Sequence, residues 1–228
     1  MDILNWVYLL KNKLVKTTVQ DPEKDLLVLG NNVSFAKRGD KYQSYGMTVQ
    51  DFAASIVPGT YGLYAQTANS TPITGTIVET SLVNGGVGTL SVPANGFKVG
   101  DSFRAVVGGV LNAANNQTIR IRVKAGALTL LDSGVQPISN ITNDIFSLNV
   151  DFTIRQLGGP GTASIVSLGS FHYAKTSNAS VQGFAFNVVN STTFNTTIPN
   201  TLDITVQWGS TNVGNNIYSD IFILNKTY

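Results

Sequence analysis

The chain of 228 residues contains no cysteine and one histidine. The lack of thiols excludes disulfide bonds, zinc–thiolate centres and cysteine nucleophiles. A single imidazole, that of His172, excludes metal sites and catalytic arrangements that need two histidines. Charged residues are scarce as well, at 12% of the chain against about 25% in an average domain. Because the net charge is only +2 and no basic stripe is present, the composition argues against nucleic-acid binding.

Long apolar runs are also missing. The N-terminal run WVYLL is five residues long, and Lys11, Lys13 and Lys16 follow it closely. A membrane-spanning helix needs about 18 consecutive apolar residues. A secretory signal peptide needs a basic start, a longer apolar stretch and a small-residue cleavage site. We therefore expect neither a membrane span nor export by that route.

The charges that are present divide the chain unevenly. Residues 1–55 hold 13 of the 28 charged side chains, whereas the remaining 173 residues hold 15. Between the two parts, residues 56–74 are rich in proline, glycine and small polar residues, with little periodicity. The pattern predicts an N-terminal region over 1–55, a linker over 56–74 and a second domain over 75–228.

The N-terminal region has a mixed pattern. Residues 26–29 form a short strand candidate, and the Gly-Asn-Asn sequence at 30–32 favours a tight turn. Thr48 is positioned to cap a short helix over 49–56. One weak helix and a few strands are too little to bury a core alone. We therefore expect a small mixed segment that folds against something else.

Two roles for this region stay open. Aromatic and basic side chains concentrate in protein interfaces, and this region could anchor the protein by docking onto a larger particle. Alternatively, it is an accessory sheet packed on the second domain. The docking hypothesis rests on six residues: Trp6, Tyr8, Lys37, Arg38, Tyr42 and Tyr45.

Residues 75–228 show about ten segments with the period of two that is typical of β-strands. The alternation is clearest in TIRIRVKA, where Ile119, Ile121 and Val123 share one face and the basic residues share the other. The segment FSLNVDFTIRQL alternates in the same way. One apolar face per strand is the mark of a sandwich. The pattern predicts an all-β fold, a jelly-roll-like antiparallel β-sandwich.

Candidate chemical groups in the sequence have simpler structural interpretations. His172 has no G-x-S-x-G motif to accompany it, so an exposed or interface position is favoured over catalysis. The glycine runs VNGGVGT and LGGPGTAS lack the G-K-[ST] ending of phosphate-binding loops. The acidic segment QDPEKD lacks the calcium-loop spacing. We expect no enzyme, no catalytic residue, no cofactor and no metal site.

Two stretches carry a family resemblance. The C-terminal run TLDITVQWGSTNVGNNIYSDIFILNKTY and the earlier run GTLSVPANGFKVGDSFRAVVGGVLNAANNQTIRIRVKAG resemble the tip domains of bacteriophage fibres, tail appendages and capsid-surface fibres. Those domains are jelly rolls similar to tumour-necrosis-factor and C1q heads, and they commonly trimerise. The segment LLVLGNNVSFAKRGDKYQSYGMTVQDF is similar to segments that attach such appendages to the particle.

The resemblance implies a structural virion protein, located in the virion, that contacts capsid or tail proteins. It also implies a homotrimer whose last strand lies near the threefold axis. Four residues are then candidates for the contact between copies: Tyr218, Ile221, Ile223 and Tyr228.

Two other classes remain alternatives. A carbohydrate-binding module for a host-surface glycan or receptor would show an exposed row of aromatic residues, with Trp208, Tyr218 and Tyr173 as candidates. Trp208 could equally fill the core. A hydrolase would need two carboxylates facing each other in a cleft, and acidic residues are scattered singly after residue 75.

Overall fold

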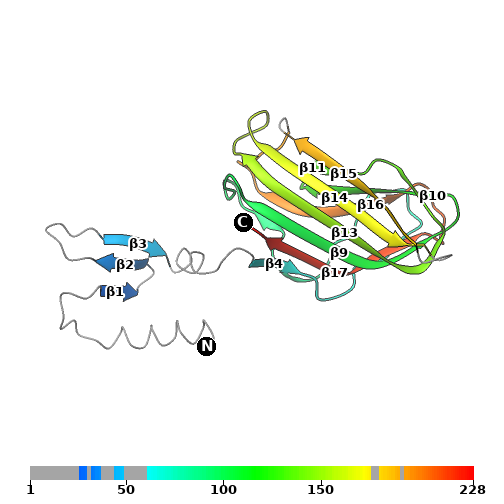
Figure 1. Cartoon of the computed structure of the whole chain (residues 1–228), viewed down its shortest axis with the longest axis horizontal. Helices are drawn as coiled ribbons and strands as arrows, with labels where there is room; N and C mark the ends of the chain where they lie inside the picture. The colour runs from blue at the N-terminus through cyan, green and yellow to red at the C-terminus, as the bar shows by residue number, and fades with distance from the viewer. Residues whose placement is uncertain (1–25, 30–31, 37–43, 49–60, 176–179, 191–192) are drawn as a thin grey trace. The chain divides into compact units, whose positions relative to one another are not determined.

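The computed structural model describes residues 26–29, 32–36, 44–48, 61–175, 180–190 and 193–228 (Figure 1). Contacts divide the chain into two units, Met1–Pro58 and Gly59–Tyr228. Within the described residues all regular structure is β-strand. The helix expected over 49–56 lies outside them.

The first unit contains a three-stranded antiparallel sheet. Its strands are β1 (Leu26–Leu29), β2 (Asn32–Ala36) and β3 (Ser44–Thr48), with β2 in the centre. The register places Leu27 opposite Phe35, and Phe35 opposite Tyr45. The strand predicted at residues 26–29 is confirmed.

The second unit is a sandwich of two antiparallel sheets. The larger has eight strands in the order β15-β14-β13-β9-β17-β4-β7, with β5 also paired to β17, and Figure 1 looks onto this sheet. The smaller has six strands, with the order β11-β10-β16-β6 and with β12 and β8 paired to β10 and β16. The larger sheet comprises β4 (Tyr61–Ala65), β5 (Ile73–Thr74), β7 (Val87–Gly88), β9 (Ser102–Ala113), β13 (Ile141–Gln156), β14 (Ser164–Ala174), β15 (Val181–Asn190) and β17 (Asn216–Lys226). The smaller comprises β6 (Thr80–Ser81), β8 (Ser91–Val92), β10 (Gln117–Ala125), β11 (Leu128–Asp132), β12 (Gln136–Ile138) and β16 (Asn200–Trp208).

The strands of the sandwich pair in a nested order, from the outermost pair inwards. The first strand of the sandwich, β4, pairs with the last, β17, and β6 and β8 pair with β16. Inside these pairs, β9 lies beside β13, and β10 lies beside β11. This nesting is the jelly-roll arrangement that the sequence predicted, extended at one edge by the hairpin of β14 and β15.

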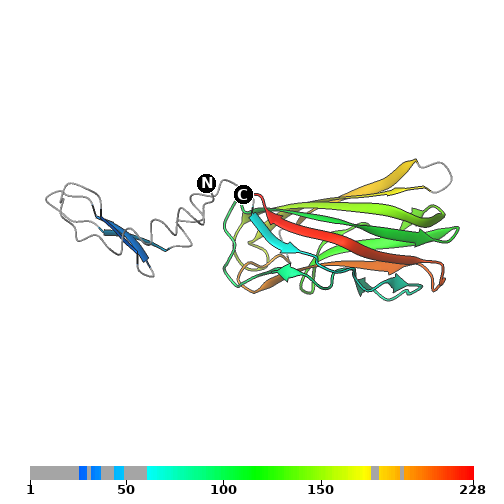
Figure 2. The same cartoon turned by 90° about the horizontal axis from the view of Figure 1, so that it is seen from below.

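The core lies between the two sheets, which Figure 2 shows from the side. The alternation predicted for β10 is confirmed, because Ile119, Ile121 and Val123 are each at most 1% exposed. Trp208, on β16, is 1% exposed, and its indole N–H donates to the carbonyl of Ile73 on β5 across 3.1 Å. The largest aromatic side chain in the sandwich therefore joins the two sheets.

The linker prediction needs correction over residues 61–74. Strand β4 pairs with β17, and Tyr64 is buried with its ring 5.3 Å from that of Phe222. The backbone continues along β17, where Gln66 N–H donates to Phe222 O across 2.8 Å. The glycines and prolines of this segment resemble a linker because its strands are too short for periodicity to show. The sandwich unit therefore begins near Gly59.

Candidate functional site

The outer face of the smaller sheet carries a group of charged side chains that pair with one another. Arg122 lies between two carboxylates, with its Nη1 2.9 Å from Glu79 Oε2 and its Nε 3.5 Å from Asp132 Oδ2. Lys124 Nζ is 3.2 Å from Glu79 Oε1, and Arg120 Nε donates to Asp132 Oδ1 across 2.8 Å. We call these five residues the ion-pair network.

The ion-pair network keeps both of its carboxylates ionised. The hydrogen bond from Arg120 lowers the pKa of Asp132 to about 2. The hydroxyl of Thr205, which donates to Glu79 Oε1 across 2.7 Å, is the main cause of the lowered pKa of Glu79. A hydrolase of the two-carboxylate type needs one carboxyl that stays protonated near neutral pH. These two acidic groups lie close together, but their lowered pKa values favour a structural role.

The outer face of the larger sheet has the opposite character. Three rows of side chains run across its strands, and we call them the apolar face. The first row contains Tyr218, Val110 and Ile145; the second contains Ile221, Gly108, Ser147, His172 and Gly183; the third contains Ala65, Ile223, Val106, Asn149, Ser170 and Ala185. None of the side chains in these rows is that of Asp, Glu, Lys or Arg.

Several apolar side chains on this side of the sheet are open to solvent. Ile145 is 71% exposed and Ile221 is 48% exposed. Beyond the three rows, Leu168 and Val189 on β14 and β15 are also more than half exposed. An exposed apolar surface of this kind is typical of a site that contacts another molecule.

Charges lie at the margins of the apolar face. Arg104 and Asp151, in the row that follows the third, pair with each other through Arg104 Nε and Asp151 Oδ1 at 2.7 Å. Asp220 is exposed in a bulge of β17, between Ser219 and Ile221. The face is thus a neutral centre with a polar edge, which is how protein interfaces are commonly built.

The structure brings together three of the four residues predicted to contact another copy. Tyr218, Ile221 and Ile223 lie on the apolar face, on the outer side of β17. Tyr228 lies beyond the end of β17, where it is 78% exposed and its ring approaches Gly100. It is not part of the three rows.

Val106 and Val110 on β9 and Ile145 on β13 were not predicted from the sequence. A signal for Val106 and Val110 exists, because both phases of the alternation are apolar in FRAVVGGVL, where one apolar face was assumed. Ile145 is directly followed by the buried Phe146, which is the same signal in a shorter form. A strand that is apolar on both sides is expected to be covered on both sides.

Five of the six predicted docking residues lie outside the described part of the chain. Trp6, Tyr8, Lys37, Arg38 and Tyr42 lie outside the described residues, and Tyr45 is described only as a backbone position in β3. Their proposed role stays a prediction.

The aromatic candidates for glycan binding occupy other positions. Trp208 and Tyr173 are buried, and Tyr218 is half-buried on the apolar face. From residue 62 onward, the one described aromatic side chain that is strongly exposed is Tyr228. The row of exposed aromatic residues that a sugar-binding surface would show is therefore not found in that described part.

A polar hollow of about 430 Å³ opens near the ends of β12, β14 and β15. Amide groups of Asn115, Asn116, Asn140 and Gln182 line it, together with Lys175 and the hydroxyl of Tyr173. The Tyr173 hydroxyl accepts from Ser139 N–H and donates to Gln182 Oε1. Amide and hydroxyl groups are suited to hydrogen bonding with sugar hydroxyls.

Among the described residues, no three metal-ligating side chains are grouped closely enough to hold a metal ion. In the same part of the chain, no helix has the length and apolar character needed to cross a membrane. No protein-family model, curated protein or solved structure matches the chain. The functional conclusion therefore rests on the site itself and on the sequence resemblance.

Proposed function

We propose that this protein is a structural component of a virion that acts by contact and not by catalysis. Its sandwich unit forms the exposed head of a fibre-like or capsid-decorating appendage, and its N-terminal region attaches the appendage to capsid or tail proteins. Three copies of the head associate through the apolar face. The sequence resemblance supplies the virion context, and the apolar face supplies the physical support.

The observation that carries the proposal is the contrast between the two outer faces. The ion-pair network satisfies its own charges and is suited to water. The apolar face leaves Ile145 and Ile221 exposed in rows that contain no Asp, Glu, Lys or Arg. Burying such side chains against a second copy removes apolar area from water, which stabilises the complex.

The size of the face sets what a contact between copies requires. Six strands about 4.8 Å apart and three rows about 6.8 Å apart span roughly 24 Å by 14 Å. The resulting area of roughly 330 Å² is less than half of the roughly 800 Å² that each partner buries in a standard stable interface, so exposed side chains beyond the rows, such as Leu168 and Val189, must also take part. A second copy of this chain is a fitting occupant, because apolar side chains need no charged partner across the contact.

The virion part of the proposal is tested on purified particles. Mass spectrometry of gradient-purified virus from a culture that encodes this chain should recover its peptides at a constant ratio to the major capsid protein. Release of the chain by a wash that leaves the capsid intact would fit a decorating position. Its complete absence from the particles, with the chain present in the lysate, would contradict the proposal.

The polar hollow supports a second candidate function, binding of a surface glycan. Its amide groups project from Asn116 and Asn140, both of which are exposed. The measurement is a glycan array probed with the wild-type protein and with the double variant Asn116→Ala and Asn140→Ala. Specific binding that the double variant loses would support this function, whereas binding that the variant keeps would place it elsewhere.

A further inference from the structure

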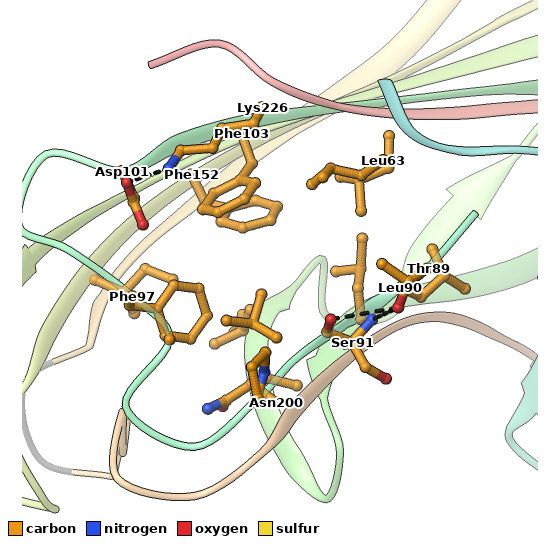
Figure 3. A pocket seen from close by; sticks show the side chains of 18 of the residues that line it. Leu63, Thr89, Leu90, Ser91, Phe97, Asp101, Phe103, Phe152, Asn200 and Lys226 are labelled. Atoms are coloured by element: carbon orange, nitrogen blue, oxygen red, sulfur yellow. Dashed lines mark hydrogen bonds and ion pairs between the residues drawn. The ribbon is translucent and has the colours of Figure 1, made fainter. Parts of the chain in front are cut away.

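A separate cavity of about 210 Å³ lies between the two sheets, at the end of the sandwich where β17 finishes. Figure 3 shows Phe97, Phe103 and Phe152 on one side of it and Leu63 and Leu90 on the other. The rings of Phe103 and Phe152 stack with their centroids 5.1 Å apart, so the aromatic side is well packed. The remaining walls are mostly apolar side chains of the core: Val92, Leu130, Ile165, Phe194, Leu202 and Leu224.

One end of this cavity carries opposite charges. Lys226 Nζ lies 2.5 Å from Asp101 Oδ1, and their side chains are 18% and 8% exposed. The other carboxylate oxygen of Asp101 accepts from the backbone N–H of Lys98 across 2.8 Å. Figure 3 shows this pair beside the phenylalanine rings. The cavity thus combines an apolar body with one polar end, as small-molecule sites commonly do.

The volume and the charges together define a class of ligand. An apolar cavity of about 150 Å³ in another protein accommodates benzene, so 210 Å³ has room for one ring with a short substituent. The charged pair offers both an acceptor, Asp101, and a donor, Lys226. A hydroxyl group can donate to the first and accept from the second. A carboxylate is repelled by Asp101 and attracted by Lys226, and an ammonium group meets the reverse, so a charged head group gains little from the pair and still loses its hydration on burial.

We propose that this cavity binds a small neutral alcohol whose apolar body is a single ring or a short alkyl chain. The ring lies among Phe97, Phe103 and Phe152, and the hydroxyl faces Asp101 and Lys226. This site is independent of the apolar face, so the proposal does not rest on the self-association of the protein.

The test compares three probes that share one ring and differ in charge at neutral pH: benzyl alcohol, benzoate and benzylamine. Two-dimensional NMR of the full-length protein follows the backbone amides around the cavity. We expect benzyl alcohol to shift them saturably, with a dissociation constant on the order of millimolar for so small a ligand. We expect benzoate and benzylamine to bind at least about tenfold more weakly. Equal binding of either charged probe would overturn the assignment of a neutral head group.

Variants locate the site. Leu90→Trp fills the cavity and should abolish the amide shifts caused by benzyl alcohol. If this variant does not fold, Val92→Phe fills the cavity with a smaller increase in side-chain volume. The matched control is Val78→Trp, because Val78 is 66% exposed and does not line the cavity. Saturable binding that persists in a folded Leu90→Trp or Val92→Phe protein would overturn the proposal. So would the absence of binding to the wild-type protein at a benzyl alcohol concentration about ten times the expected dissociation constant.

The charged pair allows a reversal experiment. Asp101→Asn removes the carboxylate and leaves the ammonium group of Lys226 without its partner. In this variant we expect benzoate to bind more tightly than benzyl alcohol, which inverts the wild-type preference. An unchanged order of affinities in a variant whose NMR spectrum shows a folded protein would overturn the placement of the head group.

Discussion

Ile221 on β17 lies directly opposite Gly108 on β9, and a methyl group at Gly108 would come within 3.0 Å of Ile221 Cγ2. The isoleucine side chain therefore covers the glycine on the apolar face. Its neighbour Gly109 faces the opposite way, where a methyl group would lie 2.0 Å from the backbone oxygen of Tyr218. Gly108 thus leaves room for a side chain on the outer surface, whereas Gly109 allows the backbones of β9 and β17 to approach closely.

This difference predicts opposite outcomes for two alanine substitutions. Gly109→Ala forces the backbones of β9 and β17 apart and should destabilise the protein by about 3 kcal/mol or more. Gly108→Ala meets one side-chain methyl group, Ile221 Cγ2, which has to give by a few tenths of an ångström, so we expect a smaller loss of about 1 kcal/mol. Urea unfolding of both variants measures the difference. Equal losses would contradict the assignment of Gly108 to the outer surface and of Gly109 to the close approach of the two backbones.

Substitutions on the apolar face should separate the copies without unfolding them. Ile221→Asp and Ile145→Asp each place a charge on the proposed contact surface, where burial without a partner is costly. Light scattering should then give the mass of the monomer, while circular dichroism stays at the wild-type value. The matched control is Val135→Asp, since Val135 is 64% exposed and lies outside the apolar face. Dissociation in the control variant as well would argue against the assigned face.

The ion-pair network predicts a dependence of stability on acid pH. The pKa of Asp132 falls from 3.8 to about 2 on folding, so the folded state resists protonation of this carboxyl. The ionised Asp132 carboxylate contributes roughly 1 to 2 kcal/mol to the free energy of unfolding. This contribution is nearly complete above about pH 4 and is lost as the pH falls towards 2. Asp132→Asn should remove this part of the loss.

Urea unfolding at pH 7 and pH 2.5 provides the measurement. The free energy of unfolding should decrease more between these two values in the wild type than in Asp132→Asn. Asp220→Asn, at an exposed position in the bulge of β17, should behave like the wild type. The same decrease in all three proteins would mean that Asp132 does not contribute.

The hydrogen bond between Trp208 and Ile73 predicts the effect of a core substitution. Trp208→Phe removes the indole N–H that reaches the Ile73 carbonyl and leaves a space in the core. We expect a loss of about 2 kcal/mol in the free energy of unfolding. Tyr228→Phe, at an exposed position, should leave the unfolding midpoint unchanged. A neutral Trp208→Phe variant would contradict the role of this side chain in joining the sheets.

The start of the sandwich unit is tested by truncation. A chain of residues 59–228 retains β4 and should remain folded and self-associated, but it should lose incorporation into particles if the N-terminal region is the anchor. A chain of residues 75–228 lacks β4 and β5, including the buried Tyr64 and Ile73, and should not fold cooperatively. A folded 75–228 chain would return the boundary to the position predicted from the sequence.

The sequence predicted the sandwich where one phase of the alternation is apolar, as in Ile119, Ile121 and Val123. It failed at β4, because pairing with a strand more than 150 positions away leaves no local pattern in five residues. It found the three residues of the apolar face that lie on β17, yet missed Val106 and Ile145, because β9 and β13 come to lie beside β17 only when the sheet is assembled. The cavity was unpredictable for the same reason.

The most direct test of the central claim is the mass of the full-length protein in solution, measured by light scattering coupled to size-exclusion chromatography. Association through the apolar face, with the threefold symmetry that the sequence resemblance implies, predicts a trimer, at three times the chain mass of 24.3 kDa, that Ile221→Asp converts to a monomer. A wild-type monomer across the micromolar range, or a trimer that Ile221→Asp leaves intact, would contradict the account.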